Sequence, residues 1–240
     1  MDKIMKDSNI LDWDSHVFKF PVAAILPLNV SQESLEGILA DLRSSGVCLV
    51  YWSPMAEDRE SCEAAEALGG FNTGVKRTYF AELSCMPLEF KVKSANAVGW
   101  DSNASKHELI KLTQARAIDS RFFKDPKSRE KHYEAVMEKW IDDSENGSLF
   151  VTKDGNTIKG FISLNEKDGN GNINFIVIDE AYSGKGLGRE LLFHAHGWFA
   201  SKRYKFVQAI TQKENSIACK MYEKYGYYIK EQRAFYHFWL

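Results

Sequence analysis

The sequence predicts a mixed α/β protein in which helices pack on a mixed β-sheet. Short apolar runs rich in β-branched and aromatic residues alternate with amphipathic helical stripes along the chain, which favours this class. The 240 residues are 44% hydrophobic and 27% charged, which is enough apolar material for a sizeable core. A stretch of weak periodicity divides the chain, so we expect a smaller β-α-β-α-β domain over residues 1–90 and a larger domain over residues 91–240.

The first part is predicted to hold three strands separated by two helices. The strand candidates are short, apolar and rich in β-branched or aromatic residues, at 21–28, 47–52 and 75–83. The first helix has Ser31 at its N-cap, a leucine-rich stripe and Gly46 at its end. The second, over 60–70, is alanine-rich and ends in glycines. Strands joined by helices in this way favour a parallel or mixed sheet.

The periodicity weakens between residues 84 and 106, where we place the boundary, with a short strand expected near 90–100. Ser105 and Glu108 form a capping box, which predicts a helix to about residue 118. A second helix follows residue 128. Its apolar residues recur at helical spacing, at Tyr133, Val136, Met137, Trp140 and Ile141.

Strands then alternate with helices to the end of the chain. A hairpin is expected over 148–164, because two β-branched and aromatic runs flank Asp154-Gly155-Asn156. The remaining candidates are a strand at 171–179, a helix to about 201, a strand at 205–212, a helix over 215–226 and a bent or paired strand region over 227–240. The larger domain therefore has the predicted order α-α-β-β-β-α-β-α-β.

Composition narrows the function classes. The 31 basic and 33 acidic residues nearly cancel, which argues against a nucleic-acid partner or a polybasic membrane anchor. The longest apolar run, 47–52, is far too short to span a bilayer, and the N-terminus lacks a secretory signal, so we expect no membrane partner and a cytoplasmic location. The four cysteines lack metal spacing, and His194 and His196 point apart on a helix, so no metal is expected.

The stretch "YSGKGLGREL", Tyr182–Leu191, places three glycines between a strand and a helix. Its spacing matches neither the G-x-G-x-x-G dinucleotide fingerprint nor the P-loop, whose Gly-Lys pair is followed by Ser or Thr. A tight turn without a ligand accounts for an isolated glycine cluster. However, the start of a helix offers free N–H groups and a favourable dipole, so a pyrophosphate fits as well, with Lys185 and Arg189 at its rim.

Two motifs resemble those of the GNAT superfamily of N-acetyltransferases. The segment "INFIVIDEAYSGKGLGRELL" is similar to its coenzyme A motif, (Arg/Gln)-x-x-Gly-x-(Gly/Ala), with Gly186 and Gly188 at the glycine positions and Ser183 where Arg or Gln is usual. The segment "NSIACKMYEKYGY" resembles the later motif, matched by Asn215, Ala218, Tyr222, Gly226 and Tyr227. The resemblance implies a GNAT fold from about residue 105 onward, preceded by a domain similar to a partial GNAT.

The same resemblance implies a binding site for acetyl-CoA as co-substrate. The main chain of Ile176, Val177 and Ile178 would contact the pantetheine arm and polarise the thioester carbonyl. The pyrophosphate would lie against the loop and helix start made by Ser183, Gly184, Lys185, Gly186, Leu187, Gly188 and Arg189. Asn215 either caps its helix alone or also touches the coenzyme.

Tyr222 is the residue that the resemblance assigns as general acid for the departing thiolate. Spacing alone favours a packing role for its ring, because it lies on an amphipathic helix with Tyr225 close by. The base that frees the amine is not identified; Glu166, His132 and Tyr79 are polar groups on suitable elements, and a water relay would also serve.

The acceptor amine is constrained only by resemblance. The segment "LDWDSHVFKF", the unit after it, "DSRFF" and the aromatic C-terminus together are similar to acetyltransferases of dTDP-linked 4-amino-deoxysugars, used for cell-surface polysaccharide. Arg121 and Phe122 would then meet the phosphates and a ring of the acceptor, although a surface loop explains them without a ligand. Another small amine, an amino acid, a protein N-terminus or a catalytically silent coenzyme A module remain alternatives, and a homodimer is left open.

Overall fold

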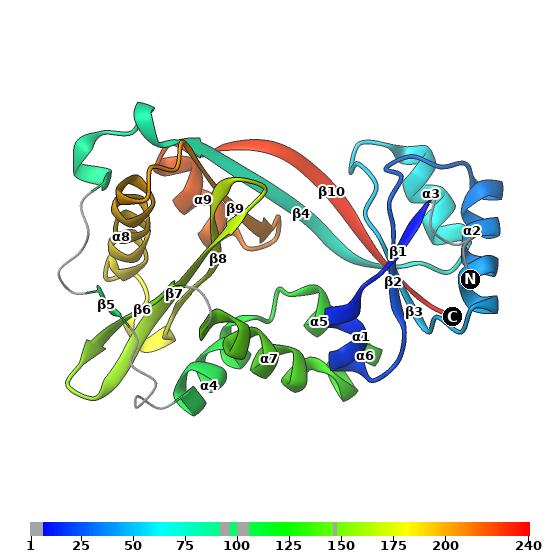
Figure 1. The fold of residues 1–240 in the computed structure, drawn as a ribbon, viewed down its shortest axis with the longest axis horizontal. Helices are drawn as coiled ribbons and strands as arrows, with labels where there is room; N and C mark the ends of the chain where they lie inside the picture. The colour runs from blue at the N-terminus through cyan, green and yellow to red at the C-terminus, as the bar shows by residue number, and fades with distance from the viewer. Residues whose placement is uncertain (1–6, 92–96, 100–105, 146–147) are drawn as a thin grey trace.

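The computed structural model describes residues 7–91, 97–99, 106–145 and 148–240. Ten strands are found in this part of the chain: β1 (Ser8–Ile10), β2 (Val22–Ile25), β3 (Leu49–Trp52), β4 (Phe71–Glu82), β5 (Ala97–Gly99), β6 (Ser148–Asp154), β7 (Thr157–Lys167), β8 (Asn170–Ile178), β9 (Phe206–Gln212) and β10 (Tyr228–Trp239). They form one mixed sheet in the order β1-β2-β3-β10-β4-β9-β8-β7-β6-β5. The predicted mixed α/β class is therefore confirmed, and Figure 1 shows the sheet running through the whole molecule.

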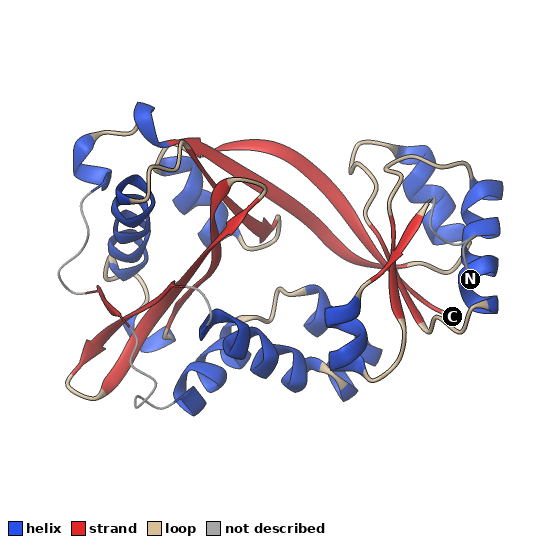
Figure 2. Ribbon diagram, viewed as in Figure 1, coloured by secondary structure: helices blue, strands red, loops and turns tan. Residues whose placement is uncertain are grey.

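The helices pack along both faces of this sheet (Figure 2). Those in the described residues are α1 (Asp12–Phe18), α2 (Gln32–Ser44), α3 (Arg59–Ala67), α4 (Lys106–Arg116), α5 (Arg121–Lys124), α6 (Pro126–Lys131), α7 (Tyr133–Glu145), α8 (Leu187–Ser201) and α9 (Ser216–Lys224), with short 3-10 turns η1 (Leu83–Cys85), η2 (Leu88–Lys91) and η3 (Glu180–Tyr182). The predicted order of strands and helices is present. β1, α1, α5 and α6 are additions that the sequence did not indicate.

Local signals start the helices where expected. The hydroxyl of Ser31 accepts a hydrogen bond from the Ser34 N–H at 3.2 Å at the start of α2. The carboxylate of Asp58 does the same for the Ser61 N–H at 3.3 Å in α3. Ser105 of the predicted capping box lies outside the described residues. Its partner Glu108 accepts from the Ile158 N–H at 3.0 Å, which joins α4 to β7.

Two long strands, β4 and β10, connect the two ends of the molecule (Figure 1). β10 pairs antiparallel with β4 from Tyr228 opposite Phe80 to His237 opposite Phe71, with two bulges. Its last residues also pair antiparallel with β3, where Tyr236 lies opposite Trp52. The C-terminal strand therefore lies inside the first half of the sheet. The division at residue 90 stays a prediction, because the sheet continues through both predicted units.

The helices divide the two faces of the sheet between them. In the larger half, α8 and α9 cover one face, with Leu191, Leu192 and Tyr222 packed on Tyr79 and Ile173. On the opposite face, α4 and α7 pack on a cluster that contains Leu109, Ile141, Val151, Phe161 and Val177. Near the N-terminus, α2 and α3 cover one face and α1, α5 and α7 the other. No helix in the described ranges is long and apolar enough to cross a membrane.

Candidate active site

The turn before α8 requires glycine at two positions. Gly184 has φ 75° and Gly186 has φ 86°, in the left-handed region that other residues rarely adopt. The η3 turn leads into it, and the Asp179 carboxylate caps η3 by accepting from the Ala181 N–H at 2.8 Å. The chain thus leaves β8, reverses through the glycines and enters α8 at Leu187.

The start of α8 presents main-chain donors to the outside. Gly186 is the N-cap residue, and no side chain caps the helix there. The Glu190 N–H donates to the Gly186 carbonyl at 3.1 Å, which closes the first turn. The N–H groups of Leu187, Gly188 and Arg189 precede this bond and have no partner within the helix. Together with the helix dipole they make an anion-binding end.

Gly188 has a different structural reason from the other two glycines. A Cβ atom at this position would lie 3.3 Å from Sδ of Met221 and 3.9 Å from Cγ1 of Ile178. The glycine therefore lets α8 approach α9 and β8 closely. Gly188 thus serves this helix packing and also lines the cavity beside the turn.

The strands β8 and β9 separate beside this turn. They pair in parallel only between Gly171–Ile173 and Val207–Ala209. A bulge between Phe175 and Ile173 changes the register of β8 against β7. The residues of β8 beyond the bulge continue to pair with β7, but no longer with β9. The end of β8 therefore splays from β9, which frees one main-chain edge of β8.

A cavity of about 580 Å³ joins the splayed strand to the glycine turn. Its size suits a small organic ligand. Nine of the predicted residues line it: Ile176, Val177, Ile178, Ser183, Gly184, Gly186, Leu187, Gly188 and Asn215. Its other walls come from the end of α4 and the first turns of α9. The structure therefore brings the two sequence motifs together around one space.

The local contacts of Asn215, and of Lys185 and Arg189 outside the cavity lining, are defined. Asn215 caps α9, where its side-chain oxygen accepts from the Ala218 N–H at 3.1 Å, and it also faces the cavity. Lys185 does not line the cavity; its Nζ donates to the Ala181 carbonyl at 2.9 Å. The exposed Arg189 folds its guanidinium over Gly186, where a Cβ would be 3.4 Å from Nη2. Both cations lie at the edge of the turn, as the sequence suggested.

Tyr222 lies beside the cavity but is not part of its wall. Only 3% of the residue is exposed, and its ring packs against those of Tyr79 and Tyr227 at centroid distances of 5.4 and 5.2 Å. Its neighbour Met221 does line the cavity. Burial raises the pKa of the Tyr222 phenol, so it is protonated at neutral pH. Its assignment as general acid stays a prediction.

Arg121 and Phe122 do not lie in an exposed loop. They lie in the short helix α5, and Phe122 is fully buried with its ring against Trp140 at a centroid distance of 5.4 Å. This packing gives Phe122 a core role in place of the predicted ring contact with an acceptor. The guanidinium of Arg121 lies 3.3 Å from the Asp14 carboxylate and 4.0 Å from the Tyr51 ring centroid. The Arg121 charge is thus met by a carboxylate within the protein.

Sequence reasoning missed the contribution of α4 to the cavity. Arg116, in the last turn of α4, and Ile118 and Asp119 beyond it line the same space as the glycine turn. The guanidinium of Arg116 lies 3.7 Å from the carboxylate of Glu180 in η3. Ile217 of α9 also lines the cavity and is 75% exposed. No local signal marks Arg116, Ile118 or Asp119, since only the packing of α4 brings them to the turn.

Comparison with known proteins supports the GNAT fold. Residues 112–227 match the family model described as the acetyltransferase (GNAT) family. A protein of unknown function from Staphylococcus epidermidis ATCC 12228 superposes with a TM-score of 0.70 at 18% identity, over 99% of this chain and 94% of that one. A GCN5-related N-acetyltransferase from Sphaerobacter thermophilus gives 0.64 at 13% identity, over 96% and 75%. These likenesses confirm the predicted fold.

One curated relative matches part of the sequence. The spore coat polysaccharide biosynthesis protein SpsD of Bacillus subtilis (strain 168) is 23% identical over 134 residues. The match spans 55% of this chain and 46% of that protein, so less than half of the relative is represented.

Proposed function

We propose that the chain is an acetyltransferase of the GNAT type, whose family model its residues 112–227 match, and that it transfers acetyl from acetyl-CoA to the amino group of a nucleotide-linked amino sugar in the cytoplasm. The observation that carries the proposal is the single cavity that joins the start of α8 to the gap between β8 and β9. An anion-binding helix end and a free strand edge are the two features that a diphosphate and an extended thiol arm need.

The residues around the cavity fit coenzyme A. Its pyrophosphate would lie on the N–H groups at the start of α8, where the left-handed Gly184 and Gly186 leave the main chain accessible. Ser183 carries no charge at the position where the family motif has Arg or Gln. Arg116 from α4 supplies a guanidinium in the same cavity. The pantetheine arm would pair with the edge of β8 at Ile176–Ile178.

When bound, acetyl-CoA supplies an activated acetyl group as a thioester. The amine forms a C–N bond to the carbonyl carbon, the C–S bond breaks, and its electron pair leaves on sulfur. In the proposal the main chain of β8 stabilises the developing oxyanion, and such donors contribute about 3 kcal/mol. The hydroxyl of Tyr222 gives its proton to the thiolate, and its burial keeps that proton in place until it is needed. The base that receives the amine proton is not assigned.

The acceptor is inferred from similarity. Short segments of the sequence resemble dTDP-fucosamine acetyltransferase, which acetylates the 4-amino group of dTDP-4-amino-4,6-dideoxygalactose, and a curated relative is named for spore coat polysaccharide biosynthesis. Two residues of the segment that carries this resemblance, Trp13 and Asp14, connect α1 to α7 and α5. Trp13 Nε1 donates to the Asp143 carboxylate, and Asp14 pairs with Arg121. These contacts hold the N-terminal helix against the rest of the molecule. For the acceptor, we propose a nucleotide-linked amino sugar.

An acetyl-transfer assay tests this function directly. The purified chain is mixed with acetyl-CoA and a panel of amines, and free thiol is measured together with the mass of the acetylated product. We expect turnover with dTDP-linked 4-amino sugars and little with amino acids or peptides. Faster acetylation of a peptide N-terminus would contradict the proposed sugar acceptor and would identify a peptide as the substrate.

A second candidate is a coenzyme A-binding module without catalysis. The burial of Tyr222 and its absence from the cavity lining favour it, since a packing role explains the ring. Tight coenzyme A binding without thiol release across the whole amine panel would identify this module.

A further inference from the structure

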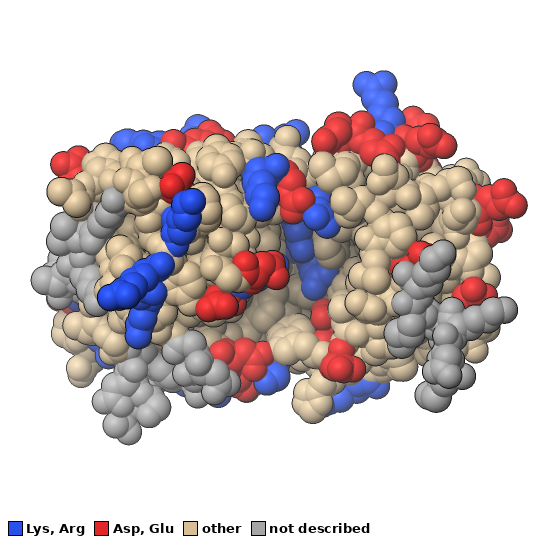
Figure 3. All heavy atoms as spheres, turned by 45° about the horizontal axis from the view of Figure 1, so that its top comes forward, with Lys and Arg blue, Asp and Glu red and all other residues tan. Residues whose placement is uncertain are grey.

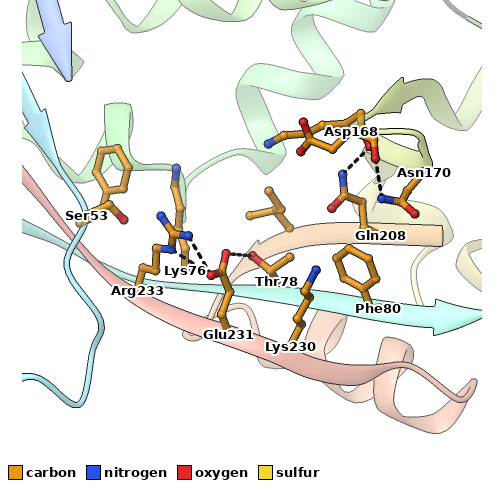
Figure 4. A pocket seen from close by; sticks show the side chains of 13 residues that line it. Ser53, Lys76, Thr78, Phe80, Asp168, Asn170, Gln208, Lys230, Glu231 and Arg233 are labelled. Atoms are coloured by element: carbon orange, nitrogen blue, oxygen red, sulfur yellow. Dashed lines mark hydrogen bonds and ion pairs between the residues drawn. The ribbon is translucent and has the colours of Figure 1, made fainter. Parts of the chain in front are cut away.

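A second hollow opens on the sheet face opposite α8 and α9. In β4, Tyr79 and Ala81 pack toward those helices, so the alternate residues Thr78 and Phe80 point to the other face. In β9 the same alternation points Gln208 and Ile210 that way. These side chains line a groove of about 430 Å³, together with residues of β10 and the β7–β8 turn. Figure 4 shows the side chains rising from the two long strands into this space.

The groove is basic although the protein is not. Its lining includes four cations, Lys76, Lys167, Lys230 and Arg233, and two acids, Asp168 and Glu231. The whole chain has a formal net charge of −2, so this excess of positive charge is local. Figure 3 shows basic side chains in and around the hollow at the middle of the molecule.

The single acid–base pair of the lining leaves the lysines without a counter-ion. Glu231 pairs with Arg233 at 2.8 Å and also accepts from the Thr78 hydroxyl at 3.3 Å. Within the described part of the chain, none of the three lysine ammonium groups has a carboxylate within ion-pair distance. A cluster of uncompensated ammonium groups in a hollow is a favourable place for a polyanion.

Aromatic rings hold two of these ammonium groups in position. Lys76 Nζ lies 3.9 Å from the centroid of the Phe235 ring, and Lys230 Nζ lies 4.1 Å from that of Phe80. Both rings belong to the lining. The cations are therefore placed over the groove floor by contacts that leave their N–H donors available.

Burial and charges on the surrounding elements shift the pKa of Lys76. Burial lowers its pKa well below the ordinary value, and the positive charges of Arg121 in α5, Lys167 and Arg233 act in the same direction, while Asp14 in α1 opposes them. A bound anion would favour the protonated ammonium and raise that pKa.

The groove also lies next to the gap through which an acceptor must reach the thioester. β9 separates the groove from the coenzyme cavity, because Gln208 and Ile210 line the groove and Asn215, shortly after the strand, lines the cavity. The pairing of β9 with β8 ends at Ala209, one residue before Ile210. A ligand anchored in the groove therefore lies beside the opening between the two strands.

We infer that this groove binds the diphosphate of the acceptor, with Lys76 and Lys230 as its principal donors, and that the acceptor is accordingly a nucleoside-diphosphate-linked amine. The inference rests on the proposed acetyltransferase function and adds the residues that select an anionic acceptor. Lys76 lies opposite Arg233, and Lys230 lies over Phe80, four residues beyond Lys76 in β4, so the positive charge extends along the groove and suits an extended nucleotide anion. A neutral amine has no group that uses them, and a plain amino acid has only one carboxylate.

Titration calorimetry on the full chain tests the groove without any catalysis. The protein is first saturated with coenzyme A, so that the phosphates of the coenzyme cannot account for binding, and dTDP is then titrated. We expect dTDP to bind and thymidine to bind at least about tenfold more weakly, because it lacks the charge.

Variants assign the site to its residues. Lys76→Met and Lys230→Met should each weaken dTDP binding at least about tenfold. Lys76→Arg should retain binding, which distinguishes lost charge from lost fold. The matched control is Lys202→Met, since Lys202 is exposed and its ammonium also lies near a ring, that of Trp198 at 5.7 Å, outside the groove.

The outcomes separate the groove from the enzyme activity. If dTDP does not bind, or if both lysine variants bind it normally, the groove has been misassigned, even when acetyl transfer to an uncharged amino sugar is observed. Competition between dTDP and coenzyme A would also overturn it, because the nucleotide would then occupy the cavity at α8. If dTDP binds in a lysine-dependent way but no acetyl transfer is found, the groove assignment stands and the proposed acetyltransferase function is wrong.

Discussion

Nδ1 of His237 lies 2.6 Å from Oδ2 of Asp125, and both side chains are buried. The same oxygen accepts from Trp239 Nε1 at 2.9 Å, and the other carboxylate oxygen accepts from the Lys127 N–H at 3.0 Å. This carboxylate therefore caps α6 and holds the C-terminal strand β10 against it. Burial opposes the ionisation of Asp125, but hydrogen bonds from His237 and Trp239 keep its pKa below the ordinary value.

The protein should become less stable as the pH decreases, because His237 resists protonation in the folded state. Burial lowers the pKa of this histidine from 6.5 to about 4 in the folded protein, despite the opposing effect of Asp125. Between pH 6.5 and 4 the unfolded state binds the proton and the folded state does not, so the free energy of unfolding decreases as the pH falls. The loss over this window is about 3 kcal/mol. Urea unfolding at several pH values measures the slope.

His237→Asn should flatten that slope, whatever its effect on stability at pH 7, because the titrating group is gone. His16→Asn, at an exposed histidine in α1, is the matched control and should keep the wild-type slope. Parallel slopes for wild type and His237→Asn would show that this residue is not the source.

Gly186→Val should abolish coenzyme A binding while the protein stays folded. The substitution puts a β-branched residue at φ 86°, which costs about 1–3 kcal/mol, and it crowds the N–H groups at the start of α8. Calorimetry with coenzyme A and circular dichroism report the two properties separately. Gly155→Val imposes a comparable strain at φ 57° in the β6–β7 hairpin and should bind normally. Normal binding by Gly186→Val would place the pyrophosphate elsewhere.

Tyr222→Phe should lower turnover by about 100-fold, as expected when a general acid is lost, with coenzyme affinity nearly unchanged. The phenylalanine ring keeps the packing against Tyr79 and Tyr227, so stability should change little. Steady-state rates and calorimetry measure both effects. Tyr225→Phe, three residues along the same segment, serves as the control. If both variants turn over at the wild-type rate, the Tyr222 hydroxyl has only a structural role.

Arg116→Met should weaken coenzyme A binding by about tenfold, because it removes a guanidinium that lines the cavity and faces the anion-binding end of α8. Its present partner, Glu180, is largely exposed and lies 3.7 Å away, so a phosphate can replace it. Glu180→Gln is the paired control and should leave affinity unchanged or increase it. A further test is salt: the affinity difference between wild type and Arg116→Met should shrink as ionic strength rises.

Short-range chemistry made much of this protein predictable. Helix starts such as Ser31 at α2 depend on a hydrogen bond three residues away, and the glycine turn depends on the local φ of Gly184 and Gly186. Both are encoded within a few positions, so the sequence indicates them directly. The motif around Asn215 was recognisable for the same reason. Its cap to Ala218 is local, although its place on the cavity wall is not.

Tertiary packing decided which distant residues meet. Arg116 reaches the glycine turn only because α4 packs beside β8, and Phe122 lies in the core because α5 is covered by α7 and β10. The basic groove needs β10 next to β4, with Arg233 opposite Lys76 across a separation of more than 150 residues. Strand order and register arise from long-range pairing that no local pattern specifies. The sequence by itself determined the elements and the turn that suits a pyrophosphate, whereas the tertiary structure alone decided which charges gather on the opposite face of the sheet.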